Sequence, residues 1–310
     1  MNKFDKMKIV TKIEYINIIN YQAFQCNSRN DKVLYYKYRQ QKPYFLMIMV
    51  NYEHNELVLE FSGKILKEKY VQLINKMTIG ECLQNINKLG FCILDTNSIL
   101  KDSQVVKCDI SLDIVADINL INSTIRQNLS NYSKWITKNY TNGMSLENVV
   151  STARYKKRLV IYNKEKELNQ ADNVNLINSL ENGEYIKNYF KGKVRFELNI
   201  NTKEQIRQML NIPSNDLLAV LNSKANPILS VIDEAVKYDL QPKRTKTLRD
   251  YERELLLEKC DFNLVKVEAV IRSLINKNTS ITRAMQPYKD LINLINSTDK
   301  PILDIRELVS

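Results

Sequence analysis

The sequence is poor in glycine, proline and histidine: 310 residues contain six glycines, six prolines and one histidine, His54. So few glycines and prolines exclude collagen-like, low-complexity and linker-dominated chains. No GxxxxGK[ST] or GxGxxG pattern occurs, so nothing indicates a nucleotide-binding loop. One histidine excludes metal sites built on a histidine pair, such as that of the HEXXH zinc proteases. His54 itself stands in the turn-like NYEHN, where an exposed turn residue is the simplest interpretation.

Cysteine is scarce too, and long apolar runs are absent. The five cysteines, Cys26, Cys82, Cys92, Cys108 and Cys260, are scattered without CxxC spacing, so a zinc site or a redox pair is not expected. The most apolar run, YFLMIMV at 44–50, is far too short to cross a bilayer, and the first residues lack the apolar core of a signal peptide. We therefore expect a protein of a reducing cytoplasm, with no membrane partner.

Basic residues are abundant: 46 Lys and Arg against 35 Asp and Glu leave a net charge of +11 and a pI near 9.2. This balance favours a polyanion such as nucleic acid as the partner, although a merely solvated surface would give the same count. Two basic stretches could follow a DNA backbone, with Tyr155 as a further phosphate contact. Their candidate residues are Lys156, Lys157, Arg158, Lys243, Arg244 and Lys246.

Alternating and β-favouring runs predict strands in VLYYKYR, YFLMIMV, ELVLEF, VVKCDISLDI at 105–114, RLVIYNK at 158–164 and KVRFELNI at 193–200. Apolar residues at three- and four-residue spacing predict helices after Lys67 and between 201 and 212. Residues 115–150 read as helix and loop around Trp135, with a turn at Asn142-Gly143. Beyond 214, long amphipathic stretches predict only helices.

Two stretches share one order of features: strand, central glutamate, turn, amphipathic helix. They are ELVLEFSGKILKEKYVQLI and GKVRFELNINTKEQIRQML. This similarity suggests an internally duplicated sheet. We therefore expect an α+β protein with an antiparallel β-sheet core in residues 1–213 and a helical C-terminal region in 214–310.

Carboxylates on rigid strands are the candidate metal ligands. Glu60, Asp109 and Glu197 each stand in a predicted strand, and Glu167 closely follows Tyr162. Oxygen ligands of this kind suit Mg²⁺ or Mn²⁺. A solvated strand face would carry the same residues, so spacing alone leaves both interpretations open.

Four blocks resemble, in the same order, segments of the replication initiators of filamentous phages, the gene II proteins. RLVIYNKEKEL resembles the segment that bears their active tyrosine, and KVRFELNINTKEQIRQMLNIP resembles the RFE-containing strand and helix that follow. Upstream, VVKCDISLDI is similar to their basic-x-Asp strand and ELVLEFSGKILKEKY to a strand with a central glutamate. The blocks cover roughly 55–213. A more distant resemblance is to the staphylococcal rolling-circle plasmid initiators.

The resemblance implies a fold related to the rolling-circle initiator endonucleases and makes Tyr162 the nucleophile that attacks a DNA phosphodiester. It also assigns family positions to Lys164, Asp109, Glu197, Glu167 and Glu60, the carboxylates as ligands of Mg²⁺ or Mn²⁺. Asp113 departs from the pattern, which has a small polar residue there. A phenol with a pKa near 10 needs a nearby cation or base to react at neutral pH. Lys164, two residues beyond Tyr162 on the predicted strand, would share its face and supply that cation.

The function that follows from the resemblance is rolling-circle initiation of DNA replication. The enzyme would nick one strand at an origin, hold the 5′ phosphate on tyrosine, free a 3′ hydroxyl, and later rejoin the strand. Its partners would be origin DNA, single-stranded or supercoiled, and a host helicase and polymerase, in the cytoplasm of a bacterial cell. Two alternatives stay open: a non-catalytic basic DNA-binding protein, and a metal-independent tyrosine recombinase or topoisomerase. The recombinase motif Arg…His-x-x-Arg…Tyr does not occur in the sequence.

Overall fold

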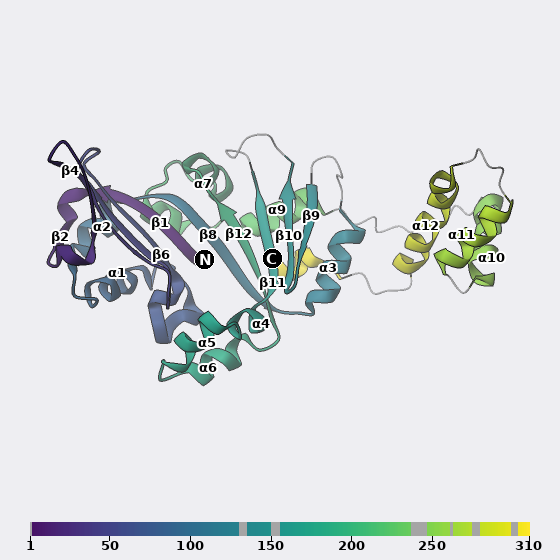
Figure 1. Ribbon diagram of the computed structural model, residues 1–310, viewed down its shortest axis with the longest axis horizontal. Helices are drawn as coiled ribbons and strands as arrows, with labels where there is room; N and C mark the ends of the chain where they lie inside the picture. Colours follow the sequence, from purple (N-terminus) through teal and green to yellow (C-terminus); the bar gives the residue numbers. More distant parts are fainter. Residues whose placement is uncertain are drawn as a thin grey trace. The chain divides into compact units, whose positions relative to one another are not determined.

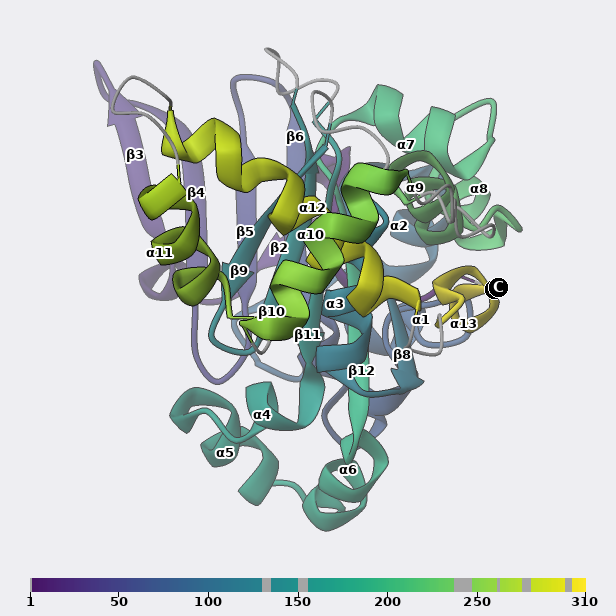
Figure 2. The same ribbon diagram turned by 90° about the vertical axis from the view of Figure 1, so that its right-hand side faces the viewer.

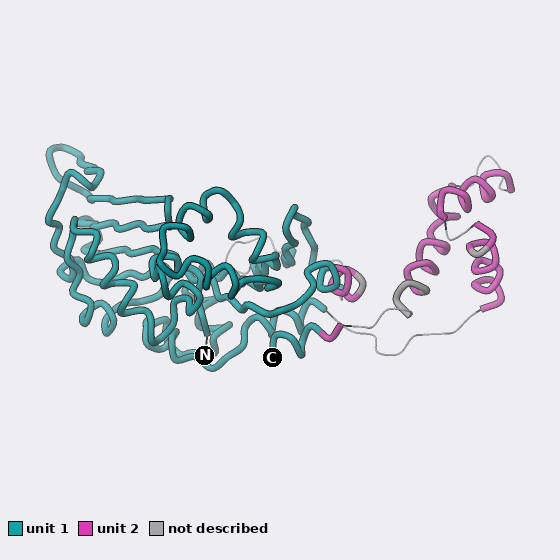
Figure 3. The backbone as a smooth tube through the Cα atoms, turned by 90° about the horizontal axis from the view of Figure 1, so that it is seen from below, with its two compact units in different colours: residues 1–122, 129–236, 305–310 teal, residues 123–128, 237–304 magenta. Residues whose placement is uncertain are grey.

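The computed structural model describes residues 2–129, 135–149, 156–236, 247–260, 263–274, 280–298 and 303–310. The chain divides into two compact units (Figure 3). Unit 1 comprises residues 1–122, 129–236 and 305–310, and unit 2 comprises 123–128 and 237–304. The structure thus groups 214–236 and the last six residues with the sheet rather than with the other C-terminal helices.

Unit 1 is built on one large antiparallel sheet, which confirms the predicted α+β class (Figure 1). In the described part of the chain, ten strands pair in the order β3 (Gln25–Arg29), β4 (Lys32–Gln40), β5 (Leu46–Asn51), β6 (Glu56–Ser62), β1 (Phe4–Lys12), β8 (Gln104–Val115), β12 (Lys193–Ile200), β11 (Arg158–Asn163), β10 (Gly143–Asn148), β9 (Trp135–Tyr140). The predicted hairpin at NYEHN joins β5 to β6.

The strand order is the same on both sides of the centre of the sheet. In one half, the meander β3 to β6 ends with β6 paired to β1, an earlier strand of the chain. In the other half, the meander β9 to β12 ends with β12 paired to β8, which likewise comes earlier in the chain. The two leading strands then pair with each other, with Lys6 opposite Asp109. This is the connectivity that an internal duplication of a five-stranded unit would produce.

Alternation along the strands gives the sheet one apolar and one polar face. On β12, Val194, Phe196 and Leu198 are fully buried, whereas Arg195 and Glu197 point to the opposite face. Helix α7 (Lys203–Leu210) packs on β8, α8 (Leu217–Asn222) also contacts β8, α9 (Pro227–Ala235) contacts β12, and α2 (Thr96–Asp102) contacts β1.

Residues 135–148 form a β-hairpin, so the prediction of helix and loop across 115–150 was wrong for this part. Helix α3 (Ile118–Gln127) is present, but β9 and β10 follow it and are joined at the Asn142-Gly143 turn. An Asn-Gly pair between two short runs is a hairpin signal, and pairing with β11 stabilises a strand that is weakly apolar by itself.

A small helical layer covers one end of the polar face. It consists of the 3-10 segment η3 (Gly63–Gln72) and helices α4 (Lys164–Leu168), α5 (Ala171–Asn178) and α6 (Gly183–Phe190). Figure 2 shows that α4 follows directly where β11 ends. These elements share an apolar cluster that includes Tyr70, Leu168, Ile186 and Phe190. The layer therefore buries side chains at that end of the sheet.

The elements not yet described belong neither to the ten-stranded sheet nor to the helical layer. In unit 1 they are η1 (Ile13–Tyr15), β2 (Ile16–Ile18), η2 (Tyr21–Ala23), α1 (Ile79–Asn87), β7 (Cys92–Leu94) and α13 (Ile305–Val309). Helices α10 (Leu248–Lys259), α11 (Leu264–Leu274) and α12 (Ile281–Thr298) of unit 2 pack around Leu257, Val267, Ile271 and Met285. Among the described residues, none of the helices has the length and apolar character needed to span a bilayer.

Candidate active site

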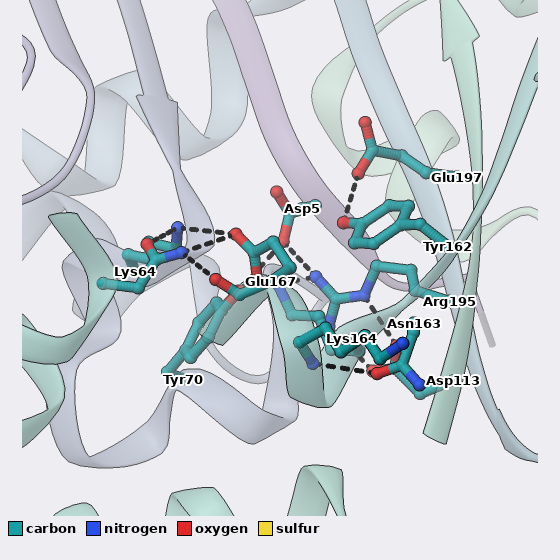
Figure 4. Close-up of polar contacts among 12 residues, drawn as sticks. Asp5, Lys64, Tyr70, Asp113, Tyr162, Asn163, Lys164, Glu167, Arg195 and Glu197 are labelled. Atoms are coloured by element: carbon teal, nitrogen blue, oxygen red, sulfur yellow. Dashed lines mark hydrogen bonds and ion pairs between the residues drawn. The ribbon is translucent and has the colours of Figure 1, made fainter. Parts of the chain in front are cut away.

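Tyr162 lies on the polar face, near the end of β11, at the margin of the helical layer. It stands opposite Arg195 on β12, two residues from Glu197 on the same strand. Its phenol donates a hydrogen bond to Glu197 Oε2 at 3.0 Å (Figure 4). A tyrosine and a carboxylate separated by 35 residues are thereby in direct contact, as the antiparallel pairing of β11 and β12 requires.

Glu197 and Asp109 approach each other through Asn199. The Asn199 Nδ2 group donates to Asp109 Oδ1 at 2.9 Å and to Glu197 Oε1 at 3.3 Å. Burial raises the pKa of Asp109, although the hydrogen bond from Asn199 opposes the shift. Burial, together with the nearby charges of Asp5 and Asp109, raises the pKa of Glu197 to about 7. The site therefore concentrates negative charge that the described protein atoms only partly neutralise.

The phenol of Tyr162 is held in its protonated form. Burial, then the charge of Glu197, raises its pKa well above the ordinary value, and Arg195 acts in the opposite direction. The phenolic proton of Tyr162 nevertheless already points at the carboxylate of Glu197, whose pKa is about 7. A base with such a pKa suits proton transfer at physiological pH.

A buried ion network lies beside Tyr162 under the helical layer. The Arg195 side chain is fully buried and donates to Asp113 through Nε at 2.6 Å and Nη2 at 2.8 Å. Its Nη1 pairs with Asp5 (Figure 4). Asp113, which departs from the family pattern, thus has a defined role as a partner of Arg195. These ion pairs fix the guanidinium opposite Tyr162.

Lys164 does not lie on the strand with Tyr162, so that prediction was wrong. The side chain of Asn163 accepts from the Lys166 amide at 2.8 Å, which caps α4 and ends β11 before Lys164. The buried Lys164 ammonium instead donates to Glu167 Oε2 at 2.5 Å. Even so, its Nζ lies 5.7 Å from the centre of the Tyr162 ring. Burial, then the Arg195 charge, lowers the pKa of Lys164.

Two of the four predicted metal ligands are paired with lysines instead. Glu60 forms an ion pair with Lys6 at 2.7 Å. Glu167 contacts Lys164 and also Lys64, at 3.3 Å. Burial opposes ionisation of Glu167, but the two lysines outweigh it and lower its pKa to about 2. Both carboxylates are therefore already neutralised.

Asp109 and Glu197 still fit a Mg²⁺ or Mn²⁺ ion. In the described part of the chain, no three His, Cys, Asp or Glu side chains are grouped so that they could hold a metal. Mg²⁺, however, is commonly bound by one or two carboxylates, with waters and substrate phosphates completing its shell. One amide group of Asn199 bridges an oxygen of Asp109 and an oxygen of Glu197, so these two oxygens converge.

The structure describes only some of the residues that were predicted to contact DNA. Arg158 lies on the polar face of β11 and donates to Asn199 Oδ1 at 3.1 Å and to Glu147 at 3.2 Å. Lys156 also reaches Glu147, at 3.5 Å, and Lys157 pairs with Glu234. Outside the described residues lie Tyr155, Lys243, Arg244 and Lys246.

A basic surface on the N-terminal half of the same face was not predicted from the sequence. The pairings place Arg39, Met47, Glu60, Lys8 and Lys107 in one row across β4, β5, β6, β1 and β8. Lys37 lies two residues before Arg39 on β4 and is therefore on the same face. Alternation along each strand was the signal, but the row appears only once the strand order is known.

Comparison of the chain with family models, with curated proteins and with solved structures gave no match.

Proposed function

We propose that this protein is a DNA nicking and joining enzyme, a rolling-circle replication initiator, whose nucleophile is Tyr162. The observation that carries the proposal is the 3.0 Å hydrogen bond from the phenol to Glu197 on a polar sheet face with cations around it. The resemblance to phage initiators points to the same tyrosine. The geometry adds a proton acceptor, and the buried Arg195 and Lys164 add positive charge beside the phenol.

In the proposed reaction, Tyr162 Oη attacks the phosphorus of a DNA phosphodiester. The phenolic proton passes to Glu197 Oε2, the bond from phosphorus to the 3′ oxygen breaks, and that oxygen takes a proton from solvent. The products are a 5′-phosphotyrosine and a free 3′ hydroxyl. Rejoining is the reverse: a 3′ hydroxyl attacks the phosphotyrosine and releases Tyr162.

Positive charge near the phenol lowers the barrier because the phenolate form must be reached. Arg195 opposes the effects of burial and Glu197 on the pKa of Tyr162. Since Arg195 is held by Asp5 and Asp113, the charge is in place before DNA binds. Lys164 lies close to the same ring and is held by Glu167.

Asp109 and Glu197 would hold Mg²⁺ or Mn²⁺. When bound, such an ion offsets the charge that develops on the phosphate oxygens. The chain's own contribution is a pair of carboxylates whose pKa values are raised by burial and, to a lesser extent, by the charge of Asp5.

Origin DNA, single-stranded or supercoiled, is the proposed substrate. Arg158 and the basic row with Lys8 and Lys107 would contact its backbone. The proposal includes a host helicase and a polymerase that extends the freed 3′ end, in the cytoplasm of a bacterial cell.

The test is the mapping of a covalent protein–DNA adduct formed in the first turnover, with DNA limiting and Mn²⁺ present. We expect the 5′ phosphate on Tyr162, and a first-turnover rate in Tyr162→Phe lower by more than about a thousandfold, because the attacking oxygen is lost. DNA binding without any adduct would favour the non-catalytic alternative. Cleavage unchanged in EDTA would favour the metal-independent one.

A further inference from the structure

Tyr140, at the end of β9, has the environment of a second nucleophile. Its side chain is 46% exposed, on the same sheet face as Tyr162. The Arg158 guanidinium donates to its phenolic oxygen through Nη2 at 3.3 Å. Ser145 Oγ lies 3.0 Å from the same oxygen and donates to Glu147 Oε1 at 3.0 Å. Because the serine hydrogen is used by Glu147, the phenol can donate to Ser145 while its oxygen accepts from the Arg158 guanidinium.

The two tyrosines lie on either side of Gly143. Gly143 on β10 is the cross-strand partner of both Tyr140 and Tyr162, which puts their Cα atoms about 10 Å apart. A Cβ at position 143 would meet the Ile161 carbonyl oxygen at 2.1 Å and Tyr162 Cβ at 2.9 Å. Glycine therefore permits this close pairing, and position 143 itself places no side chain between the two tyrosines.

A continuous set of hydrogen bonds joins Tyr140 to the candidate active site. It runs from Tyr140 to Arg158, to Asn199, to Glu197 and to Tyr162. The two phenols differ in their surroundings. The contacts with Ser145 and Arg158 lower the pKa of Tyr140, in contrast to the raised pKa of Tyr162. Tyr140 is the more readily ionised of the two.

We propose that Tyr140 is a second nucleophile of the same centre, which cleaves a second DNA phosphodiester while Tyr162 carries the first 5′ phosphate. This inference rests on the proposed function. It solves a problem that one tyrosine leaves: an enzyme whose only nucleophile is covalently occupied cannot cut a second site.

In this step, Tyr140 Oη attacks the second phosphorus, and the bond to the 3′ oxygen breaks. The phenolic proton passes to solvent, to which Tyr140 is 46% exposed, and the 3′ oxygen takes a proton from solvent. The new 3′ hydroxyl then attacks the phosphorus held on Tyr162. That attack breaks the bond to Tyr162 Oη, which takes up a proton as the attacking hydroxyl releases its own. It joins the new 3′ end to the first 5′ end and leaves the second 5′ phosphate on Tyr140.

The experiment treats the full chain with Mn²⁺ and an excess of a random-sequence pool of 3′-labelled single strands. A denaturing gel separates chains with one adduct from chains with two. Trypsin leaves Tyr140 in the peptide 139–154 and Tyr162 in 159–164, each with a single tyrosine, so mass spectrometry assigns both sites. We expect wild type to form a two-adduct species with DNA on both peptides.

Tyr140→Phe should reduce the two-adduct species at least about a hundredfold, because the attacking oxygen is removed. Tyr52→Phe is the matched control: Tyr52 is also 46% exposed, in the turn between β5 and β6, and its variant should keep both adducts. Single adducts on Tyr162 with no second adduct, or a second adduct that persists in Tyr140→Phe, would overturn the role of Tyr140 alone. Absence of every adduct in wild type would overturn the proposed function and this inference together.

Discussion

Replacing Glu197 by glutamine should stabilise unit 1 at alkaline pH while it lowers nicking. The carboxyl is buried between β8 and β11, close to Asp5 and Asp109, and its pKa is raised to about 7. The folded state therefore retains a proton that the unfolded chain releases at a lower pH. Glutamine keeps the shape and an acceptor oxygen for Tyr162 but carries no charge at any pH.

The magnitude follows from linkage. An ordinary glutamate has a pKa of 4.5, and the difference from about 7 corresponds to up to about 3 kcal/mol. Because the folded-state pKa of this acid is raised, its ionisation lowers stability progressively as pH increases from 4.5 to 7, and the cost is constant above 7. The advantage of Glu197→Gln should thus be below about 1 kcal/mol at pH 5 and near its full value at pH 8.

Urea unfolding at pH 5, 6, 7 and 8, without divalent metal, measures this difference. Trp135 is the only tryptophan, is buried, and belongs to unit 1, so its fluorescence reports that unit alone. Glu60→Gln is the control, because Glu60 occupies a comparable strand position but is paired with Lys6. Because that replacement removes an ion pair, it should not stabilise unit 1. A pH-independent difference between Glu197→Gln and wild type would refute the electrostatic reasoning.

Three further outcomes are expected. Arg195→Met should lower the unfolding free energy of unit 1 by about 3 to 5 kcal/mol, because it leaves buried carboxylates without their cation; equal urea midpoints would contradict this. Gly143→Ala should cost about 1 to 3 kcal/mol or disrupt the β10–β11 pairing, measured by Trp135 fluorescence, since backbone occupies the space of the added methyl. Replacing Lys8, Lys37 and Lys107 by glutamine should reduce the slope of log K against log salt by about 0.9 per lost phosphate contact; an unchanged slope would remove this surface from the DNA-binding site.

Much of the sheet could be predicted from local pattern. Alternation identified β8, β11 and β12, and the link NYEHN identified the β5–β6 hairpin. The strands β1, β2, β3 and β7 and the β9–β10 hairpin were missed. β9 is mostly exposed beyond Trp135, so its pattern lacks a clear apolar face. Its strand conformation depends on pairing with β10, a contact that single-segment periodicity does not report.

The candidate site was predictable in part. Asp109, Tyr162 and Glu197 were identified, and the structure brings them to one face around Asn199. Glu60 and Glu167 were grouped with them because all are carboxylates at positions that the resemblance to phage initiators assigns. Sequence spacing could not reveal that lysines from other elements neutralise both.

The sequence by itself determined which side of each strand is polar, because alternation depends only on neighbouring residues. The end of β11 also depends on a local contact, the Asn163 cap, although the predicted strand ran one residue too far, through Lys164. Only the tertiary structure decided which polar residues meet. The contact of Tyr162 with Glu197, the bridge of Asn199 and the position of Tyr140 across Gly143 depend on strand order and register. A shift of one residue in any of these pairings would send every side chain of that strand to the opposite face, so register, set by packing of the whole apolar side, determines the site.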